Sequence, residues 1–269
     1  MQSFYKRTWA EIDLDALHFN LKQIRGALPR NMDIMAVVKA DAYGHGDRMI
    51  AKSLEQDGVR SFAVSNINEA VGLRRHGIHS NILILGYTPP EAAADLADYR
   101  ISQAVFSAGY AQQLSNACVK NGITVNCHIK LDTGMSRIGI SASDTEAAVS
   151  EISAICALPN LNCCGLFSHF SSADSLDPAS VSYTKTQETR FLAVREALES
   201  DGISFTSFAK QRGDRFLQYS KLSICTRGHY PVWMPAKRRT APFPFKTGNG
   251  AAQHCLYGKD NSCRNCCFL

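Results

Sequence analysis

Ile34-Met35-Ala36-Val37-Val38-Lys39-Ala40-Asp41-Ala42-Tyr43-Gly44-His45-Gly46 is the stretch of sequence that decides the fold. Five apolar residues precede the lysine, and small residues and glycines follow it. A strand that is apolar along its whole length is buried on both faces, which is typical of a parallel sheet covered by helices. The glycines allow a ligand to come close to the backbone. We therefore expect a buried parallel strand that ends at Lys39.

Similar apolar runs recur along residues 1–209, with helical spacing between them. Further strands are expected at 62–64, 82–85, 104–106, 125–131, 164–167 and 203–208. Helices are expected at 51–56, 68–76, 91–98, 108–121, 145–158 and 186–200. This alternation predicts an α/β fold with a parallel sheet. Seven strands favour an incomplete (β/α)8 barrel of the TIM type, and an open doubly wound sheet is the alternative that periodicity leaves open.

Charge and cysteine content divide the chain near residue 209. Residues 1–209 carry 18 basic and 22 acidic residues, whereas residues 210–269 carry 11 basic and two acidic residues. Five of the ten cysteines also lie in 210–269. Such a jump in composition marks a boundary. We expect a barrel domain over 1–209 and a tail of different character over 210–269.

Composition also restricts the class of protein. Hydrophobic residues make up 45% of the chain and charged residues 20%, as in folded globular proteins. The sequence has no apolar run long enough for a transmembrane helix, and its first residues lack the apolar core of a secretory signal. We expect a cytoplasmic protein without a membrane partner.

Four polar side chains lie at or just beyond the ends of the predicted strands, where a barrel carries its chemistry. They are Lys39, Lys130, Arg137 and His169. Each alone has an ordinary explanation, because a lysine at a strand end is usually solvated and a lone histidine usually has a structural partner. Lys39 differs, since it emerges from an apolar strand and a partly desolvated amine favours Schiff-base chemistry.

Four segments resemble motifs of the alanine racemase family, in the family's order. Residues 36–46 are similar to the segment that carries the pyridoxal-phosphate lysine, and residues 9–17 resemble the N-terminal motif. Residues 130–139 are similar to the motif of the fifth strand, and residues 165–170 match the motif of the sixth. The resemblance covers residues 9–209, so it implies the N-terminal barrel of that family.

The resemblance implies a role for each candidate residue. Lys39 would hold pyridoxal 5'-phosphate as a Schiff base and act as one of two bases that move the α-proton. Tyr43 would contact the cofactor phosphate, and His169 would pack against the pyridine ring. Arg137 would lie beside the cofactor's phenolic oxygen and the substrate carboxylate. Lys130 would be either a carbamylated lysine that orients the arginine or an ordinary lysine paired with an acid.

The resemblance also implies an activity, the interconversion of L- and D-alanine for cell-wall synthesis. The substrate would be a small amino acid, and the family forms homodimers in which the partner subunit supplies a tyrosine base. Two alternatives remain open at this point. One is a serine racemase of the same fold, and the other is a protein that binds pyridoxal phosphate without racemising.

After the seventh strand the sequence departs from the family pattern. The family continues with Ala-Asn-Ser-Ala-Ala, which binds phosphate, but this chain reads Ala209-Lys210-Gln211-Arg212-Gly213-Asp214. Removing one adenine from codons for Lys-Gln-Arg-Gly gives Asn-Ser-Ala-Ala, and the same shifted frame allows Val-Arg-Ala-Gly-Ile at 225–229. We infer a one-nucleotide insertion at Ala209–Lys210. Residues 210–269 would then be an out-of-frame tail, which we expect to be disordered.

An out-of-frame tail has functional consequences. We expect the eighth strand to be lost, which leaves two open sheet edges, and the family's β-rich second domain to be missing. Little or no activity and no stable homodimer are expected of this chain. The zinc-like motif His254, Cys255, Cys263 and Cys266 and the basic run 237–239 would be accidental, so we expect neither a metal nor a nucleic-acid partner.

Overall fold

The computed structural model describes residues 11–28, 32–173, 175–209 and 228–231 of the chain. Its centre is a parallel sheet with the strand order β8-β7-β5-β4-β3-β2-β1-β9, and β6 pairs with β5 beside this path. The strands are β1 (Met32–Val37), β2 (Ser61–Val64), β3 (Asn81–Ile84), β4 (Ile101–Val105), β5 (Val125–Asp132), β6 (Ile140–Ser141), β7 (Leu161–Ser168), β8 (Thr206–Ala209) and β9 (Gly228–Pro231).

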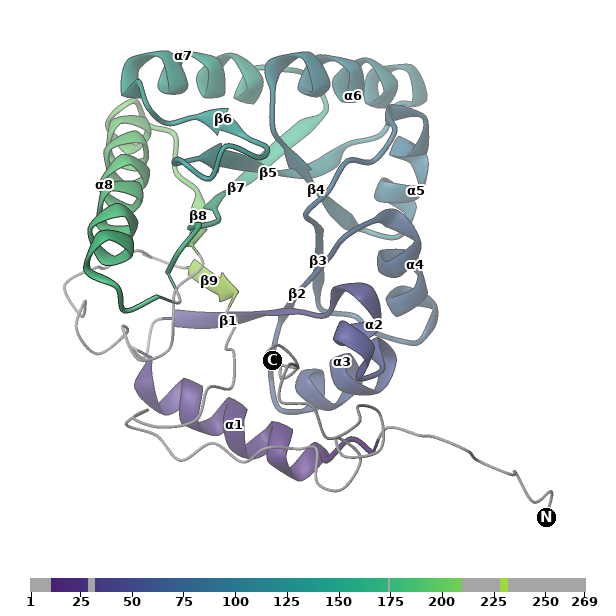
Figure 1. Cartoon of the computed structure of the whole chain (residues 1–269). Helices are drawn as coiled ribbons and strands as arrows, with labels where there is room; N and C mark the ends of the chain where they lie inside the picture. The colour runs from purple at the N-terminus through teal and green to yellow at the C-terminus, as the bar shows by residue number, and fades with distance from the viewer. Residues whose placement is uncertain (1–10, 29–31, 174, 210–227, 232–269) are drawn as a thin grey trace.

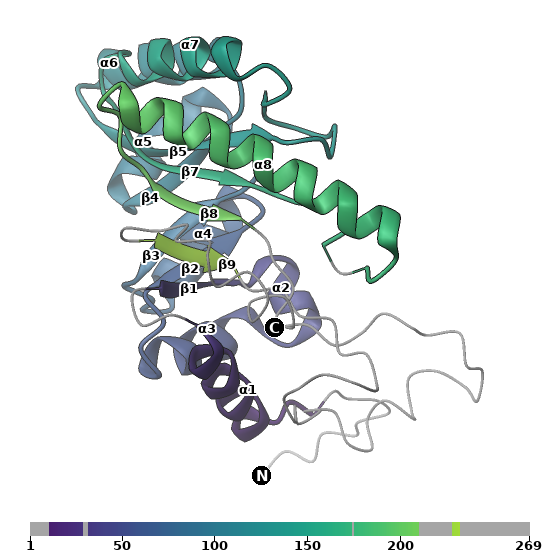
Figure 2. The same cartoon turned by 90° about the vertical axis from the view of Figure 1, so that its left-hand side faces the viewer.

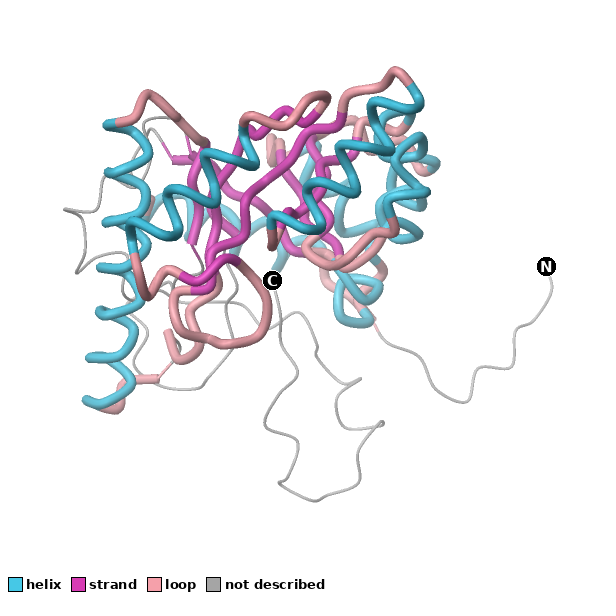
Figure 3. Tube along the Cα trace, turned by 90° about the horizontal axis from the view of Figure 1, so that it is seen from above, coloured by secondary structure: helices cyan, strands magenta, loops and turns pink. Residues whose placement is uncertain are grey.

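Helices cover the outside of this sheet, which curls around a centre (Figures 1 and 3). They are α1 (Leu14–Ala27), α2 (Lys39–Gly44), α3 (Asp47–Gln56), α4 (Ile67–Arg75), α5 (Ala93–Asp98), α6 (Ala108–Asn121), α7 (Thr145–Cys156) and α8 (Pro178–Ser200), with a 3-10 turn at Pro90–Ala92. Strand followed by helix around a curled parallel sheet is the arrangement of a (β/α)8 barrel. The predicted fold class is therefore confirmed, and an open doubly wound sheet is excluded.

Successive side chains of the strands belong to two hydrophobic clusters on opposite faces of the sheet. The larger cluster fills the space between sheet and helices and includes Ile34 of β1, Leu54 of α3 and Leu73 of α4. The smaller cluster lies on the opposite face of the strands, and its buried members are Met35, Ala63, Leu83, Ala104 and Phe167. Because successive strand residues point to opposite faces, these five side chains occupy the inside of the curl.

All seven strands expected before residue 209 are present, with boundaries that shift by at most three residues. Three helices and strands before residue 209 were not expected: α1, α2 and the short strand β6. The first of these follows ordinary rules, because Asp13 caps the helix by accepting a hydrogen bond from the Ala16 amide at 2.9 Å. Leu17 and Leu21 lie one turn apart and are both buried.

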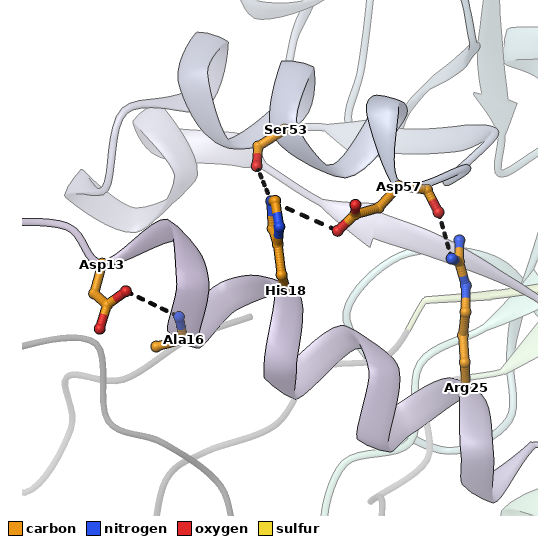
Figure 4. A network of polar contacts seen from close by, with 6 residues as sticks. All are labelled: Asp13, Ala16, His18, Arg25, Ser53 and Asp57. Atoms are coloured by element: carbon orange, nitrogen blue, oxygen red, sulfur yellow. Dashed lines mark hydrogen bonds and ion pairs between the residues drawn. The ribbon is translucent and has the colours of Figure 1, made fainter.

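The docking of α1 on α3 uses polar as well as apolar contacts (Figure 4). His18 Nε2 lies 2.5 Å from Ser53 Oγ and 3.6 Å from the Asp57 carboxylate. Two turns further along, the Arg25 guanidinium donates to the Asp57 carbonyl oxygen. These contacts hold α1 against α3.

The edge of the sheet at β1 differs from the sequence-based expectation. We expected it to be open, but Gly228–Pro231 forms β9 and pairs with β1 in parallel, with His229 opposite Asp33 and Tyr230 opposite Ile34. β9 also lies next to β8 (Figure 2), although no ladder joins these two strands in the described part of the chain. The expectation is wrong here because strand pairing uses only backbone groups, and an open edge accepts any backbone that passes in register.

Other expectations for the tail fall on residues that the structure does not describe. The segments 210–227 and 232–269 lie outside the described residues, and so do the zinc-like motif and the basic run 237–239. Within the described residues, none of the helices combines the length and apolar character that crossing a membrane requires.

Candidate active site

Lys39 begins a left-handed turn at the carboxyl end of β1. The φ angles of Ala40, Asp41, Ala42 and Tyr43 are 52°, 55°, 49° and 56°. Each such residue costs about 1–2 kcal/mol, because its Cβ lies too close to the following carbonyl oxygen. Backbone strain of this kind is found at ligand and active sites, where surrounding contacts hold it in place. Sequence patterning could not find this turn, since α2 has no helical periodicity.

Glu69 supplies much of the support for this turn. Its carboxylate accepts hydrogen bonds from the Ala40 amide at 2.9 Å and from the Ser65 amide at 2.7 Å. Glu69 belongs to α4 and therefore ties the end of β1 to the end of β2. On the far side of the turn, the Asp41 carboxylate accepts from the Asp47 amide at 2.9 Å. Sequence analysis missed Glu69 because its partners are backbone amides, which carry no residue-type signal.

The turn brings Lys39 and Tyr43 together. The Lys39 ammonium lies 6.0 Å from the centre of the Tyr43 ring, and both side chains are half-buried. Burial raises the pKa of the Tyr43 phenol, which keeps the hydroxyl protonated as a hydrogen-bond donor. An amine and a phenolic donor therefore lie side by side at the carboxyl end of β1.

Lys130 lies inside the barrel on β5, with only 6% of its surface exposed. Its Nζ donates to the Leu131 carbonyl at 3.3 Å and lies 4.9 Å from the centre of the Phe167 ring. Burial and, to a lesser extent, the charge of Arg137 lower the pKa of this amine to about 7, against the opposing effect of Asp132. An amine with this pKa is present in both its charged and its neutral form at pH 7, so a carbamylated lysine and a lysine paired with an acid both stay open.

Arg137 lies on the loop between β5 and β6 and is exposed. Asp132 shapes the start of this loop by accepting hydrogen bonds from the amides of Gly134 at 2.9 Å and Ser136 at 3.0 Å. Gly139 ends the loop with a φ of 132°, and a Cβ there would lie 2.7 Å from the Asp132 nitrogen. The loop therefore returns tightly onto β5 and holds Arg137 near Lys130.

His169 directly follows β7 and is half-buried. In β7, Gly165 allows the His128 ring of β5 to lie against the strand, since a Cβ there would be 2.1 Å from His128 Nδ1. Lys39, Arg137 and His169 thus follow β1, β5 and β7. Because the strands are parallel, all three residues lie at the carboxyl ends of the strands, on one side of the barrel, as expected for a barrel site.

Comparison with known proteins identifies the family. The profile described as "Alanine racemase, N-terminal domain" matches residues 12–215. The chain belongs to the alanine racemase N-terminal domain family. The match ends close to the boundary near residue 209 that charge and cysteine content indicate.

Individual relatives agree with this family. The alanine racemase of Clostridium tetani is 45% identical over 195 residues, which are 72% of this chain and 49% of the relative. That of Clostridium perfringens is 40% identical over 230 residues, which are 83% of this chain and 58% of the relative. The chain thus spans about half the length of the curated alanine racemases it matches.

Solved structures agree with the fold. An alanine racemase from Clostridium difficile 630 superposes with a TM-score of 0.76 at 33% identity, over 85% of this chain and 58% of that structure. A histidine racemase from Leuconostoc mesenteroides has a TM-score of 0.70 at 22% identity, a likeness that extends to the fold alone.

Proposed function

We propose that this chain is the pyridoxal-phosphate-binding barrel of an amino-acid racemase that acts on alanine. The observation that carries the proposal is Lys39 at the mouth of a barrel of the alanine racemase family, on a left-handed turn held by Glu69. Family membership supports an isomerase. The activity of this chain by itself is a separate question, because its relatives are about twice as long.

The side chains at the carboxyl ends of the strands match the chemical groups of pyridoxal phosphate. Pyridoxal phosphate has an anionic phosphate, a phenolic oxygen and an aldehyde, and the chain offers the Tyr43 hydroxyl, the Arg137 guanidinium and the Lys39 amine. Arg137 is exposed, so its guanidinium can bind an anion. Asp132 and Gly139 hold the two ends of its loop in place. The ring of His169 offers a flat, partly apolar face for the pyridine.

When bound, the cofactor acts as an electron sink that makes the α-hydrogen of an amino acid acidic. The residues of this chain would hold it and move one proton. Lys39 Nζ would hold the aldehyde end and carry the α-proton on one side, while Tyr43 would bind the phosphate. Arg137 would bind the substrate carboxylate, and His169 would cover the ring. By the resemblance to the family, the partner subunit of a homodimer would supply the proton donor for the opposite side.

Lys130 has the chemistry that carbamylation needs. With a pKa of about 7 and almost no exposed surface, its amine is neutral in a substantial fraction of molecules near pH 7. A neutral amine attacks carbon dioxide: an N–C bond forms, one C–O π bond opens, and the amine releases a proton to solvent. The resulting anion would pair with Arg137 and orient it. Nuclear magnetic resonance with ¹³C-labelled bicarbonate should show a carbamate signal that disappears in Lys130→Met.

Cofactor attachment tests the proposal directly. The purified chain is incubated with pyridoxal phosphate and reduced with borohydride, and its peptides are mapped by mass spectrometry. We expect saturable labelling at Lys39 that Lys39→Ala abolishes, whereas Lys120→Ala, which removes an exposed lysine of α6, leaves it unchanged. Labelling that is spread over surface lysines, or that persists in Lys39→Ala, would refute the proposal.

The substrate is tested by isotope exchange in D₂O. A chain with one working base should exchange the α-hydrogen of L-alanine without producing D-alanine, and should do so less well with L-serine. Faster exchange of serine than of alanine would favour a serine racemase. Labelling at Lys39 without any exchange would favour a protein that binds the cofactor without racemising.

A further inference from the structure

The loops that carry Arg137 and His169 are joined by one side chain, Gln187 of α8. Its amide is completely buried, with 0% of the residue exposed. Nε2 donates to Thr133 Oγ1 at 3.4 Å, on the loop that leads to Arg137. Oε1 accepts from both the amide and the hydroxyl of Ser171 at 3.1 Å, two residues after His169. Gln187 therefore contacts both loops with opposite ends of one planar group.

The hydrogen bonds around Gln187 fix the direction of its amide. Ser168 Oγ donates its single hydrogen to the Leu131 carbonyl at 3.0 Å. In its hydrogen bond with Thr133 Oγ1, at 2.9 Å, Ser168 Oγ must therefore be the acceptor. Thr133 then uses its own lone pair to accept from Gln187. Reversing the amide would place its NH₂ group against the Ser171 amide, leaving two donors face to face. Only one orientation of Gln187 satisfies the network, and a buried unsatisfied amide costs about 1–3 kcal/mol.

Neighbouring residues of α8 hold the same loop. Tyr183 donates to the Gly134 carbonyl at 2.6 Å, and Arg190 donates to the Thr133 carbonyl at 3.1 Å. Tyr183, Gln187 and Arg190 are spaced by four and three residues, so they lie on one face of the helix. A 23-residue helix is a rigid support for a loop that otherwise consists of turns. Gln187 also accepts hydrogen bonds from Ser171 in the loop that follows β7.

We propose that Gln187 is a positioning residue that sets Arg137 relative to His169 and thereby determines how well the site binds the cofactor. This inference rests on the proposed function, which places the cofactor between those two residues. The hydrogen bonds of Gln187 go to Thr133 and Ser171, so it would act on Arg137 and His169 through these two residues. Its removal should therefore weaken cofactor binding while the attachment at Lys39 stays possible at saturation.

The test combines Gln187→Met with hydrogen exchange and cofactor titration on the full chain. We expect amides of both loops, 133–139 and 169–172, to exchange at least tenfold faster than in the parent chain. The dissociation constant for pyridoxal phosphate should rise at least tenfold, with unchanged labelling of Lys39 at saturation. Gln112→Met, the same change at an exposed site of α6, is the matched control and should alter neither quantity.

A double-mutant cycle separates positioning from general weakening of the fold. If Gln187 acts through Arg137, then Gln187→Met should weaken cofactor binding far less in an Arg137→Ala background. Equal effects in both backgrounds would overturn the inference, as would unchanged exchange of residues 133–139 or cofactor affinity within twofold of the parent chain. If Gln187→Met does not fold, Thr133→Val replaces it, because this change removes the hydroxyl to which Gln187 donates. The same measurements on Thr133→Val then test the inference.

Failure of the proposed function gives a different result. If the parent chain shows no labelling at Lys39, the proposed function is refuted, and a positioning role for a cofactor falls with it. If the parent chain is labelled and the Gln187 and Thr133 variants bind equally well, only the inference about Gln187 is overturned.

Discussion

At the scale of single residues, Lys130 shows how burial changes chemistry. Its residue type and position on the fifth strand could be predicted from the sequence, but its ionisation could not. That property depends on the surrounding Phe167 ring, the nearby Arg137 charge and the loss of water, which only the fold determines. The same holds for Glu69, whose partners are backbone amides brought together by two strand ends.

Lys130 should make stability depend on pH. Its pKa falls from 10.5 to about 7 on folding, so between these values the unfolded chain binds one proton more than the native chain. The free energy of unfolding should therefore rise with pH in this window, by about 1 kcal/mol per pH unit, relative to Lys130→Met. In carbonate-free buffer, urea unfolding should find Lys130→Met more stable than the parent near neutrality.

That advantage of Lys130→Met should shrink as the pH rises and vanish as it approaches the ordinary lysine pKa. Well below the native pKa of about 7 it should be constant, because Lys130 is then fully protonated in both the native and the unfolded chain. Lys120→Met is the control, since Lys120 is exposed and its replacement should shift stability equally at every pH. A pH-independent difference for Lys130→Met would contradict a buried neutral amine.

Glu69→Gln should loosen the left-handed turn. The carboxylate accepts two backbone hydrogen bonds, and an amide retains one oxygen while presenting a donor to the other N–H. We expect a loss of about 1–3 kcal/mol in the free energy of unfolding and faster amide exchange at Ala40 and Ser65. Glu91→Gln, at an exposed position of the 3-10 turn, should change neither quantity.

At the scale of elements, the apolar pattern located the seven strands, because most of their described side chains are buried between the helices and the inside of the barrel. It could not find α2, whose left-handed turn has no periodic pattern, or β6, which has two residues. It also gave no information on which residues hold the loops in place. The hydrogen bonds of α8 to the loop after β5 join residues about 50 positions apart, and those to the loop after β7 join residues 16 positions apart. Such pairs appear only when the helix is in place.

Gly139→Ala should detach the loop that carries Arg137 from β5. A Cβ there would meet backbone atoms of Lys130, Leu131 and Asp132 at 2.7–2.9 Å, and the φ of 132° is itself unfavourable for alanine. We expect a loss of stability above about 1 kcal/mol and weaker binding of pyridoxal phosphate. Calorimetry and cofactor titration measure the two effects. Gly109→Ala, at a helix position with no atom within 4 Å, is the control and should be harmless.

At the scale of the whole molecule, the sequence predicts a barrel followed by a tail in another reading frame. This proposal is tested by sequencing genomic DNA across the codons for Phe208 to Arg215. One adenine fewer would mean that the natural chain continues in the family's frame, and its product should bind pyridoxal phosphate more tightly than this chain. Confirmation of the printed reading would make residues 210–269 the genuine continuation of the barrel.

The pairing of β9 with β1 has a consequence for biosynthesis. β1 leaves the ribosome before β9, its second neighbour in the sheet, which ends at residue 231, almost 200 residues later. A nascent chain must therefore keep the backbone groups of β1 unpaired on one side until Gly228–Pro231 has been synthesised. Contacts between distant segments also form slowly. Until β9 emerges, that bare edge is where chaperones or neighbouring nascent chains would attach first.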